Sequence, residues 1–174
     1  MISTKKKSTL IVFYLLFTTF LIFGSYQAKA QENIVSEEDL VESTDSMNMP
    51  IFLYKGSPYT GVANSFNKSG QLNLKSNLTD GKYDGLMEAY YENGKIHSIL
   101  NFKNGIREGL YEEYYQNGKL RKKANVINGQ PEGLALRYYD NGQVEEETNF
   151  KNGKKDGVWK AYYENGQLKE EVNY

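Results

Sequence analysis

Glycine recurs along this chain at a fixed spacing of 24 residues, and this spacing constrains the fold more than any other feature. Self-similarity at a fixed period is the signature of a repeat architecture, in which one small unit is copied and each copy packs against its neighbours. We therefore divide the chain into units that start near residues 61, 85, 109, 133 and 157. The three series are Gly61, Gly85, Gly109, Gly133 and Gly157; Gly70, Gly94, Gly118, Gly142 and Gly166; and Gly81, Gly105, Gly129 and Gly153.

Each unit carries the signals of a β-hairpin. Two adjacent tyrosines, such as Tyr114 and Tyr115, are followed by one polar residue and then by Asn-Gly. Asn-Gly between β-forming residues is the strongest short-range hairpin signal, because Asn and Gly tolerate the positive φ angles of a tight turn. The first unit is degenerate, with Phe66-Asn67 in place of the tyrosines, as expected of a terminal unit. The sequence predicts an all-β fold, an elongated single-layer antiparallel sheet of stacked 24-residue hairpins.

The Asn-Gly corner at residues 93–94, taken as a two-residue loop, fixes the cross-strand partners. Tyr91 then faces Ile96, and Tyr90 faces His97. Because alternate side chains of a strand point in opposite directions, this pairing separates the two faces of the sheet. The face with Tyr91 and Ile96 is expected to be packed, and the face with Tyr90 and His97 to be wetter. A three-residue or bulged loop would reverse the assignment.

The first thirty residues have the three-part layout of a secretory signal peptide. Lysines at 5–7 precede an apolar run over residues 10–23, and the tripeptide Ala28-Lys29-Ala30 follows. The small residues of that tripeptide predict cleavage directly after it. The alternative is an uncleaved membrane anchor, although 14 apolar residues are short for a spanning helix, which needs about 20. We expect an exported bacterial protein, periplasmic or secreted, with no integral membrane segment after cleavage.

Residues 31–49 are rich in acidic and small polar side chains and hold too few apolar ones to form a core. We therefore expect a flexible acidic tether there, ahead of a repeat domain over residues 50–174. Removal of residues 1–30, which hold four lysines and no acid, leaves 17 basic and 22 acidic side chains, a net charge of −5. Because nucleic-acid binding relies on basic side chains that displace counterions from phosphates, we expect no nucleic-acid partner.

The stretch over residues 102–126 resembles a MORN repeat of the longer bacterial variant, and the resemblance covers residues 61–174. Bacterial chains with such repeats are often classed as YwqK-type antitoxins. The resemblance therefore implies an antitoxin or immunity function, and the signal peptide would place the toxin outside the cytoplasm. The residues that match the family pattern are Gly105, Gly109, Tyr114, Tyr115, Asn117, Gly118 and Leu120.

Groups suited to catalysis are scarce. The chain has no Cys and a single His, His97, which has no equivalent in the other units. The sequence shows no nucleophile triad, phosphate-binding loop or dinucleotide fingerprint, so we expect no enzyme, no catalytic residue and no cofactor. One acidic residue per unit precedes a glycine; a single carboxylate is too few for Ca²⁺, so we predict a turn role and no metal site. These residues are Asp84, Glu108, Glu132 and Asp156.

The first tyrosine of each pair is the candidate contact for a partner. In the predicted sheet these residues form a ladder with a spacing of about 10 Å, which is two strand spacings. Tyrosine offers rigid, amphipathic contact area that suits a binding surface. The second tyrosine of each pair is expected to pack across strands. The candidate partner-binding residues are Tyr90, Tyr114, Tyr138 and Tyr162.

Repetition without a reactive cluster favours an exported protein–protein interaction module. Two alternatives stay open: an antitoxin or immunity-type protein that neutralises a toxin outside the cytoplasm, and a binder of the cell envelope or of glycans. The sheet edge near Tyr174 adds a further partner, a second copy of the chain, because unpaired edge strands invite pairing.

Cleavage of the signal peptide is tested by the N-terminus of the exported protein. The chain recovered from the periplasm or the medium should begin at Gln31, since the small residues before it suit the signal peptidase. N-terminal sequencing and intact mass measurement distinguish this outcome from an anchored chain. A chain that keeps Met1 and stays in the membrane fraction would contradict the prediction.

Overall fold

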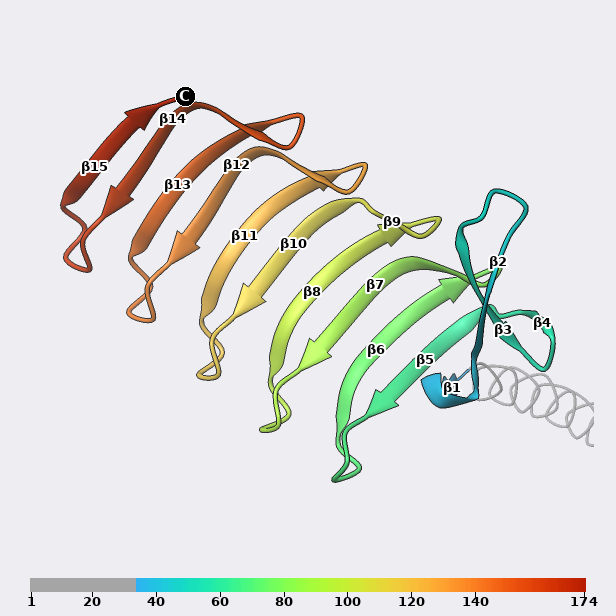
Figure 1. The fold of residues 1–174 in the computed structure, drawn as a ribbon. Coiled ribbons are helices and arrows are strands. Elements are labelled where there is room, and N and C mark those ends of the chain that lie inside the picture. The colour runs from blue at the N-terminus through green and yellow to red at the C-terminus, as the bar shows by residue number, and fades with distance from the viewer. Residues whose placement is uncertain (1–33) are drawn as a thin grey trace, which may run out of the picture. The chain divides into compact units, whose positions relative to one another are not determined.

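The computed structural model describes residues 34–174, so the predicted signal peptide over residues 1–30 lies outside the described residues. The repeat units form one 12-stranded sheet in which successive strands pair antiparallel (Figure 1), which confirms the predicted fold class. No helix in residues 34–174 has the length and apolarity to span a bilayer. The large sheet contains, in spatial order, β1 (Ile34–Ser36), β5 (Gly61–Phe66), β6 (Leu72–Thr79), β7 (Lys82–Tyr90), β8 (Ile96–Lys103), β10 (Gly109–Tyr114), β11 (Leu120–Ile127), β12 (Gln130–Tyr138), β13 (Val144–Lys151), β14 (Lys154–Tyr162) and β15 (Leu168–Asn173), with β9 (Ile106–Arg107) paired to β8.

Two kinds of Asn-Gly corner join the strands. At Asn104-Gly105 both residues have positive φ angles, 50° and 82°, as a two-residue type I′ turn requires. At the other corner the Tyr91 N–H donates to the Lys95 carbonyl at 2.8 Å, and the Gly94 N–H donates to the Tyr91 carbonyl at 2.9 Å. Of the loop residues 92–94, only Gly94 has a positive φ angle, 77°. This corner is a three-residue loop closed by a left-handed glycine, so the predicted two-residue loop is wrong.

A β-bulge beside the three-residue loop changes which side chains meet. Tyr90 pairs with Ile96, and the next pair is Ala89 with Ser98, which leaves His97 as the extra residue. The prediction that Tyr90 faces His97 is therefore wrong. Beyond the bulge the register is the predicted one, because the extra residue compensates for the longer loop. The same shift recurs beside Phe66, Tyr114, Tyr138 and Tyr162.

The second tyrosine of each pair links its unit to the next. Its hydroxyl donates a hydrogen bond to a backbone carbonyl of the following unit, so the expected packing across strands includes a polar link. Tyr163, in the last unit, is 50% exposed, and its hydroxyl makes no hydrogen bond within residues 34–174. The three links run from Tyr91 to Tyr114 at 2.6 Å, from Tyr115 to Tyr138 at 2.6 Å and from Tyr139 to Tyr162 at 2.7 Å.

One glycine series has its fixed spacing for a backbone reason. Gly109 has a φ angle of 95°, which residues with a Cβ rarely adopt. The side chain of Asn101 lies against it, and its Nδ2 donates to the Leu110 carbonyl at 2.8 Å. Each such glycine therefore sits where an amide side chain ties two strands together. Equivalent bonds run from Asn77 to Leu86 and from Asn149 to Val158.

The acidic residues before these glycines act at turns, as predicted, in two units. Glu108 Oε2 accepts a hydrogen bond from the Asn128 N–H at 2.9 Å, and Glu132 Oε2 accepts one from the Asn152 N–H at 2.7 Å. Each carboxylate therefore holds the type I′ turn of the following unit. The equivalents Asp84 and Asp156 make no such bond within the described part of the chain.

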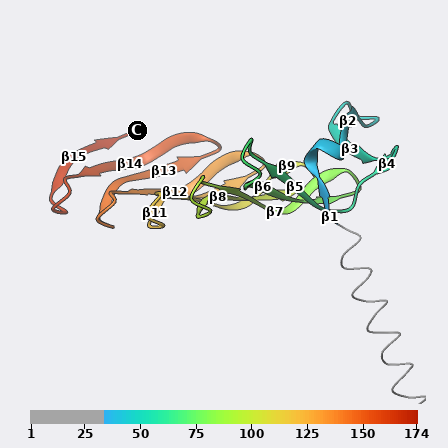
Figure 2. The same cartoon turned by 90° about the horizontal axis from the view of Figure 1, so that it is seen from below.

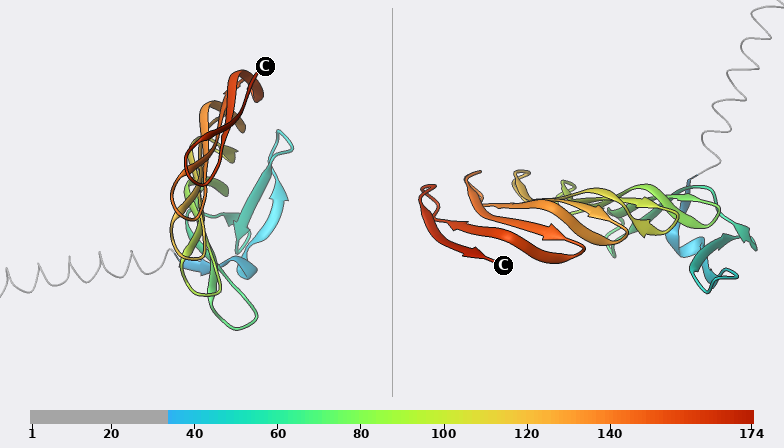
Figure 3. Two further views of the ribbon diagram at one scale, coloured as in Figure 1. Left: turned by 90° about the vertical axis from the view of Figure 1, so that its left-hand side faces the viewer. Right: turned by 90° about the horizontal axis from the view of Figure 1, so that it is seen from above.

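Residues 34–59, which we call the cap, pack on one side of the repeat sheet (Figures 2 and 3). The cap contains β1, a short 3₁₀ helix η1 (Glu37–Asp39) and a three-stranded sheet of β2 (Val41–Thr44), β3 (Pro50–Tyr54) and β4 (Ser57–Pro58). Val35 and Tyr59 pack with Ala63 and Leu78 of the sheet in a buried apolar cluster.

The cap corrects the prediction of a flexible tether over residues 31–49. Residues 34–49 are packed and paired, while residues 31–33 lie outside the described residues. Their few apolar side chains suffice because they cover a sheet that already exists and need no core of their own. The Phe52 N–H also donates to the Gly81 carbonyl at 2.7 Å, which joins the cap to the sheet.

The tyrosine link is tested by removing a single hydroxyl. Tyr115→Phe deletes the bond to the Tyr138 carbonyl and should lower the free energy of unfolding by about 0.5–1.5 kcal/mol, the net value of a typical hydrogen bond. Tyr163→Phe is the matched control and should change it by less than about 0.5 kcal/mol, as most surface substitutions do. Urea denaturation of the mature chain measures both; equal losses would sink the link as a source of stability.

Candidate binding faces

The repeat sheet has two chemically different faces. The groove face carries small buried side chains, and the cap covers this face over β5–β7. The tyrosine face is its opposite and carries the predicted contact tyrosines. Figure 2 shows the cap on one side of the sheet only, so the later strands are free of it on both faces. The small buried residues of the groove face are Ala63, Ser76, Ser98, Ala124, Ala135 and Thr148.

The four predicted tyrosines lie on one face, because each occupies the same position of its unit. Each is paired with an aliphatic residue of the next strand, so tyrosine and aliphatic side chains alternate along a ladder across the sheet. The aliphatic partners were expected on the opposite face, and the β-bulge is the reason for the difference. The pairs are Tyr90 with Ile96, Tyr114 with Leu120, Tyr138 with Val144 and Tyr162 with Leu168.

Carboxylates hold tyrosines of this ladder in place. The Tyr114 hydroxyl donates to Glu112 Oε2 at 2.9 Å. Burial, followed by that hydrogen bond and the charge of Glu112, raises the pKa of Tyr114 above its ordinary value. Burial and the charge of Glu88 raise the pKa of Tyr90 in the same way. These phenols stay neutral at physiological pH and present their rings as fixed contact area.

A second row on the tyrosine face consists of aliphatic residues that the search for binding residues did not single out. Each directly follows a glycine of the series at 85, 109, 133 and 157, so the sequence signal was the recurring Gly-aliphatic pair. Each shares a strand and a side-chain direction with a ladder tyrosine four residues later. The row exposes apolar surface at every unit: Leu86 is 44% exposed, Leu110 38%, Leu134 50% and Val158 37%.

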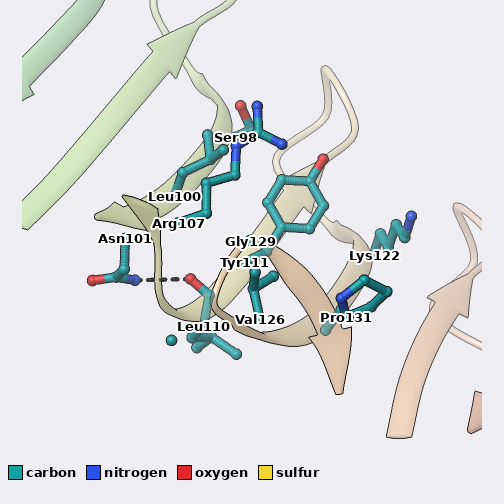
Figure 4. A pocket seen from close by; sticks show the side chains of 12 residues that line it. Ser98, Leu100, Asn101, Arg107, Leu110, Tyr111, Lys122, Val126, Gly129 and Pro131 are labelled. Atoms are coloured by element: carbon teal, nitrogen blue, oxygen red, sulfur yellow. Dashed lines mark hydrogen bonds between the residues drawn. The ribbon is translucent and has the colours of Figure 1, made fainter. Parts of the chain in front are cut away.

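The groove face holds a cavity of about 490 Å³ between β8 and β12 (Figure 4). Its wall includes Arg107 from β9, Tyr111 from β10, Lys122 from β11 and Pro131 from β12. A second cavity, of about 300 Å³, continues from Lys122 toward β13. Together they make an open groove that runs across several units.

Hydrogen bonds fix the polar side chains along this groove. The Tyr111 hydroxyl donates to Glu113 Oε2 at 3.0 Å, and Arg121 pairs with the other oxygen of that carboxylate at 2.7 Å. Burial, then the hydrogen bond and charge of Glu113, raise the pKa of Tyr111 to about 12. The His97 ring lies 4.7 Å from the ring of Tyr91, and its Nε2 is 4.0 Å from Glu113. His97 thus lies on the groove face, where the sequence had not placed it.

Glu146 organises the next part of the groove. It accepts hydrogen bonds from Trp159 Nε1 at 2.8 Å and from Thr148 Oγ1 at 2.7 Å, and it pairs with Arg137. Burial alone would raise the pKa of Glu146, but these hydrogen bonds and the Arg137 charge hold it below its ordinary value. The carboxylate is therefore ionised and saturated with donors, which is the behaviour of a structural anchor.

Stacked antiparallel hairpins, linked from unit to unit and open on both faces, define the class of this protein as a β-hairpin repeat protein. A comparison with protein families matches the MORN repeat variant at residues 83–104, 107–128, 131–152 and 155–174. The chain belongs to the MORN-repeat proteins. The degenerate first unit lies outside the matched residues, as its departures from the pattern explain.

Two further comparisons complete the picture. None of the curated proteins matches the chain by sequence. A solved structure of a mutant of S. aureus TarM in complex with Fondaparinux, alpha-GlcNAc-glycerol and UDP matches with 11% sequence identity and a TM-score of 0.36. The match covers 78% of this chain and 23% of that chain, so this chain spans less than a quarter of its length. At this TM-score the likeness carries no argument about function.

The state of Tyr111 is tested by titration. The folded protein keeps its phenol proton to about pH 12, whereas an unfolded tyrosine loses it near pH 10. Between these values the unfolded state binds fewer protons, so this group lowers the free energy of unfolding as the pH rises. Glu113→Gln removes an acceptor and a charge, and should lower the pKa of Tyr111. NMR of labelled tyrosine side chains measures it; an unchanged midpoint would show that Glu113 has no part in the shift.

Proposed function

We propose that this protein is a non-catalytic module that binds a protein partner along the tyrosine face. The observation that supports the proposal is the pair of parallel rows on that face. One row alternates tyrosine with aliphatic side chains, and the other exposes an aliphatic residue in each unit. Rigid aromatic rings beside exposed apolar residues are the composition of the energetic centres of protein interfaces.

The repeated geometry gives this face its capacity. Because each unit contributes the same tyrosine and the same aliphatic residue, contact area accumulates with the number of units that a partner spans. Ion pairs separate the two rows, such as Lys123 with Glu112 at 3.9 Å and Lys160 with Glu171 at 3.7 Å. Exposed pairs of this kind contribute little stability, but they restrict which partner charges the face accepts.

The proposed location is outside the cytoplasm. The charged, apolar and small-residue parts of residues 1–30 support export, and the sequence holds no Cys that an oxidising compartment would convert to a disulfide. The sheet instead uses tyrosine, asparagine and carboxylate hydrogen bonds to join its units, which work equally in reducing and oxidising surroundings.

A second candidate function is antitoxin or immunity activity against a toxin met outside the cytoplasm. The resemblance of residues 102–126 to the repeats of YwqK-type antitoxins supports it. This function is a special case of partner binding, with a toxin as the partner. Co-expression with the product of an adjacent toxin-like gene should restore growth, and continued growth arrest would count against it.

Partner binding is tested by capture with face-specific variants. The mature chain is used as bait in envelope extracts of the cells that produce it, and the proteins retained are quantified by mass spectrometry. Tyr114→Ala combined with Tyr138→Ala should reduce recovery of the partner by about tenfold or more, since central aromatic residues each contribute more than about 1 kcal/mol.

The matched control changes the opposite face. Arg107→Ala combined with Lys122→Ala removes two exposed side chains of the groove and should leave recovery of the same partner unchanged. Circular dichroism verifies that both variants fold. Equal recovery by the tyrosine variant and the wild type would remove the tyrosine ladder from the binding surface, and recovery of glycan instead of protein would favour the envelope-binding alternative.

A further inference from the structure

The groove face already binds one acidic segment, which belongs to the chain itself. Residues 34–45 of the cap contain five acidic side chains and no basic one. Two of the five contact β7: Asp45 pairs with Lys82 at 2.6 Å, and Glu37 accepts a hydrogen bond from the Tyr83 hydroxyl at 3.3 Å. The cap thus shows what chemistry this face holds at its first two units.

Apolar side chains complete that contact. The Phe52 ring lies 5.0 Å from the ring of Tyr83, which in turn lies 5.5 Å from the ring of Phe102. Phe102 belongs to β8, the strand next to those that the cap covers. The cap therefore combines carboxylates with an aromatic anchor, and the aromatic surface on which it packs continues toward the open part of the groove.

The open groove offers a cationic version of the same surface. One repeat after Tyr83 the equivalent position is Arg107, and Lys122 stands across Tyr111 from it (Figure 4). Neither cation has a carboxylate within ion-pair distance in residues 34–174. The 490 Å³ cavity that both line contains no acidic side chain, and its apolar wall includes Leu100, Val126 and Pro131.

This local charge contrasts with the molecule as a whole. Residues 34–174 carry 17 basic and 21 acidic side chains, a net charge of −4. Elsewhere on the groove face Arg121 and Arg137 are neutralised by Glu113 and Glu146. A groove lined by two free cations in an acidic protein attracts an acidic ligand and repels a basic one.

We propose that the groove between β8 and β12 binds an extended acidic peptide segment of a partner protein, held by carboxylates on Arg107 and Lys122 and by an apolar anchor on Leu100, Val126 and Pro131. The Tyr111 hydroxyl donates to Glu113, so its oxygen is free to accept a backbone N–H of the peptide. This site lies on the face opposite the tyrosine ladder, and the proposal does not rest on the proposed function of that ladder.

The test uses the mature chain and a synthetic probe. The probe is a fluorescein-labelled dodecapeptide with alternating Glu and Ser residues around a central Phe, and its binding is followed by fluorescence anisotropy. The wild type should bind it with an affinity that falls as salt is added. A peptide with Lys in place of each Glu should not bind, and a probe without Phe should bind about tenfold more weakly, as loss of a buried aromatic anchor implies.

Two variants of equal charge locate the site. Arg107→Glu with Lys122→Glu should weaken binding of the probe by about tenfold or more, because two charge-assisted contacts become repulsive. Lys75→Glu with Lys160→Glu makes the same change in net charge on the tyrosine face and should weaken binding by no more than about threefold. Circular dichroism and capture of the tyrosine-face partner show that both variants remain folded.

Several outcomes would overturn the proposal. They are no binding of the acidic probe by the wild type at about 1 mM, equal losses in the two charge variants, and indifference to removal of Phe. Heparin competing with the probe as well as unlabelled peptide does would assign the groove to an anionic polysaccharide instead. Failure of this site leaves the tyrosine face untouched, because the partner of that face is measured separately in the same variants.

Discussion

The hydrogen bond from the second tyrosine of one unit to a carbonyl of the next is the contact on which the stacking of this protein depends. A single-layer sheet has no second layer to bury its side chains, so its strands must be held by backbone bonds and by links along one surface. Tyr115 supplies such a link at 2.6 Å, and Asn101 and Glu108 add others at the strand and the turn. Because these links use fixed positions of the unit, the sheet extends by repetition alone.

The sequence predicted the repeat sheet well, because its signals are local and recur in every unit. Asn104-Gly105 is the two-residue turn that such a dipeptide favours, but the Asn-Gly pair at 93–94 occupies a longer loop with the same letters. The dipeptide alone cannot distinguish the two, since the difference lies in whether Asn itself takes a positive φ angle. Both the loop and the bulge at His97 follow from that choice.

The cap and the groove were beyond sequence reasoning for a different reason. The apolar residues of the cap are too few for a core, and their role depends on a surface that exists only after the repeats have folded. Arg107 likewise reads as one more turn residue until the structure sets it beside Tyr111 and Lys122. The candidate tyrosines, by contrast, were placed together on one face from their spacing, although their aliphatic neighbours were not.

Exposed Tyr163 has a consequence for how such chains change over generations. Its hydroxyl occupies the position from which every earlier unit reaches its successor, so an internally duplicated unit meets a ready attachment point. Recombination between identical segments can therefore lengthen or shorten the sheet in whole units without disturbing any existing contact. The molecule behaves as a ruler whose graduations are conserved while its length is free to vary.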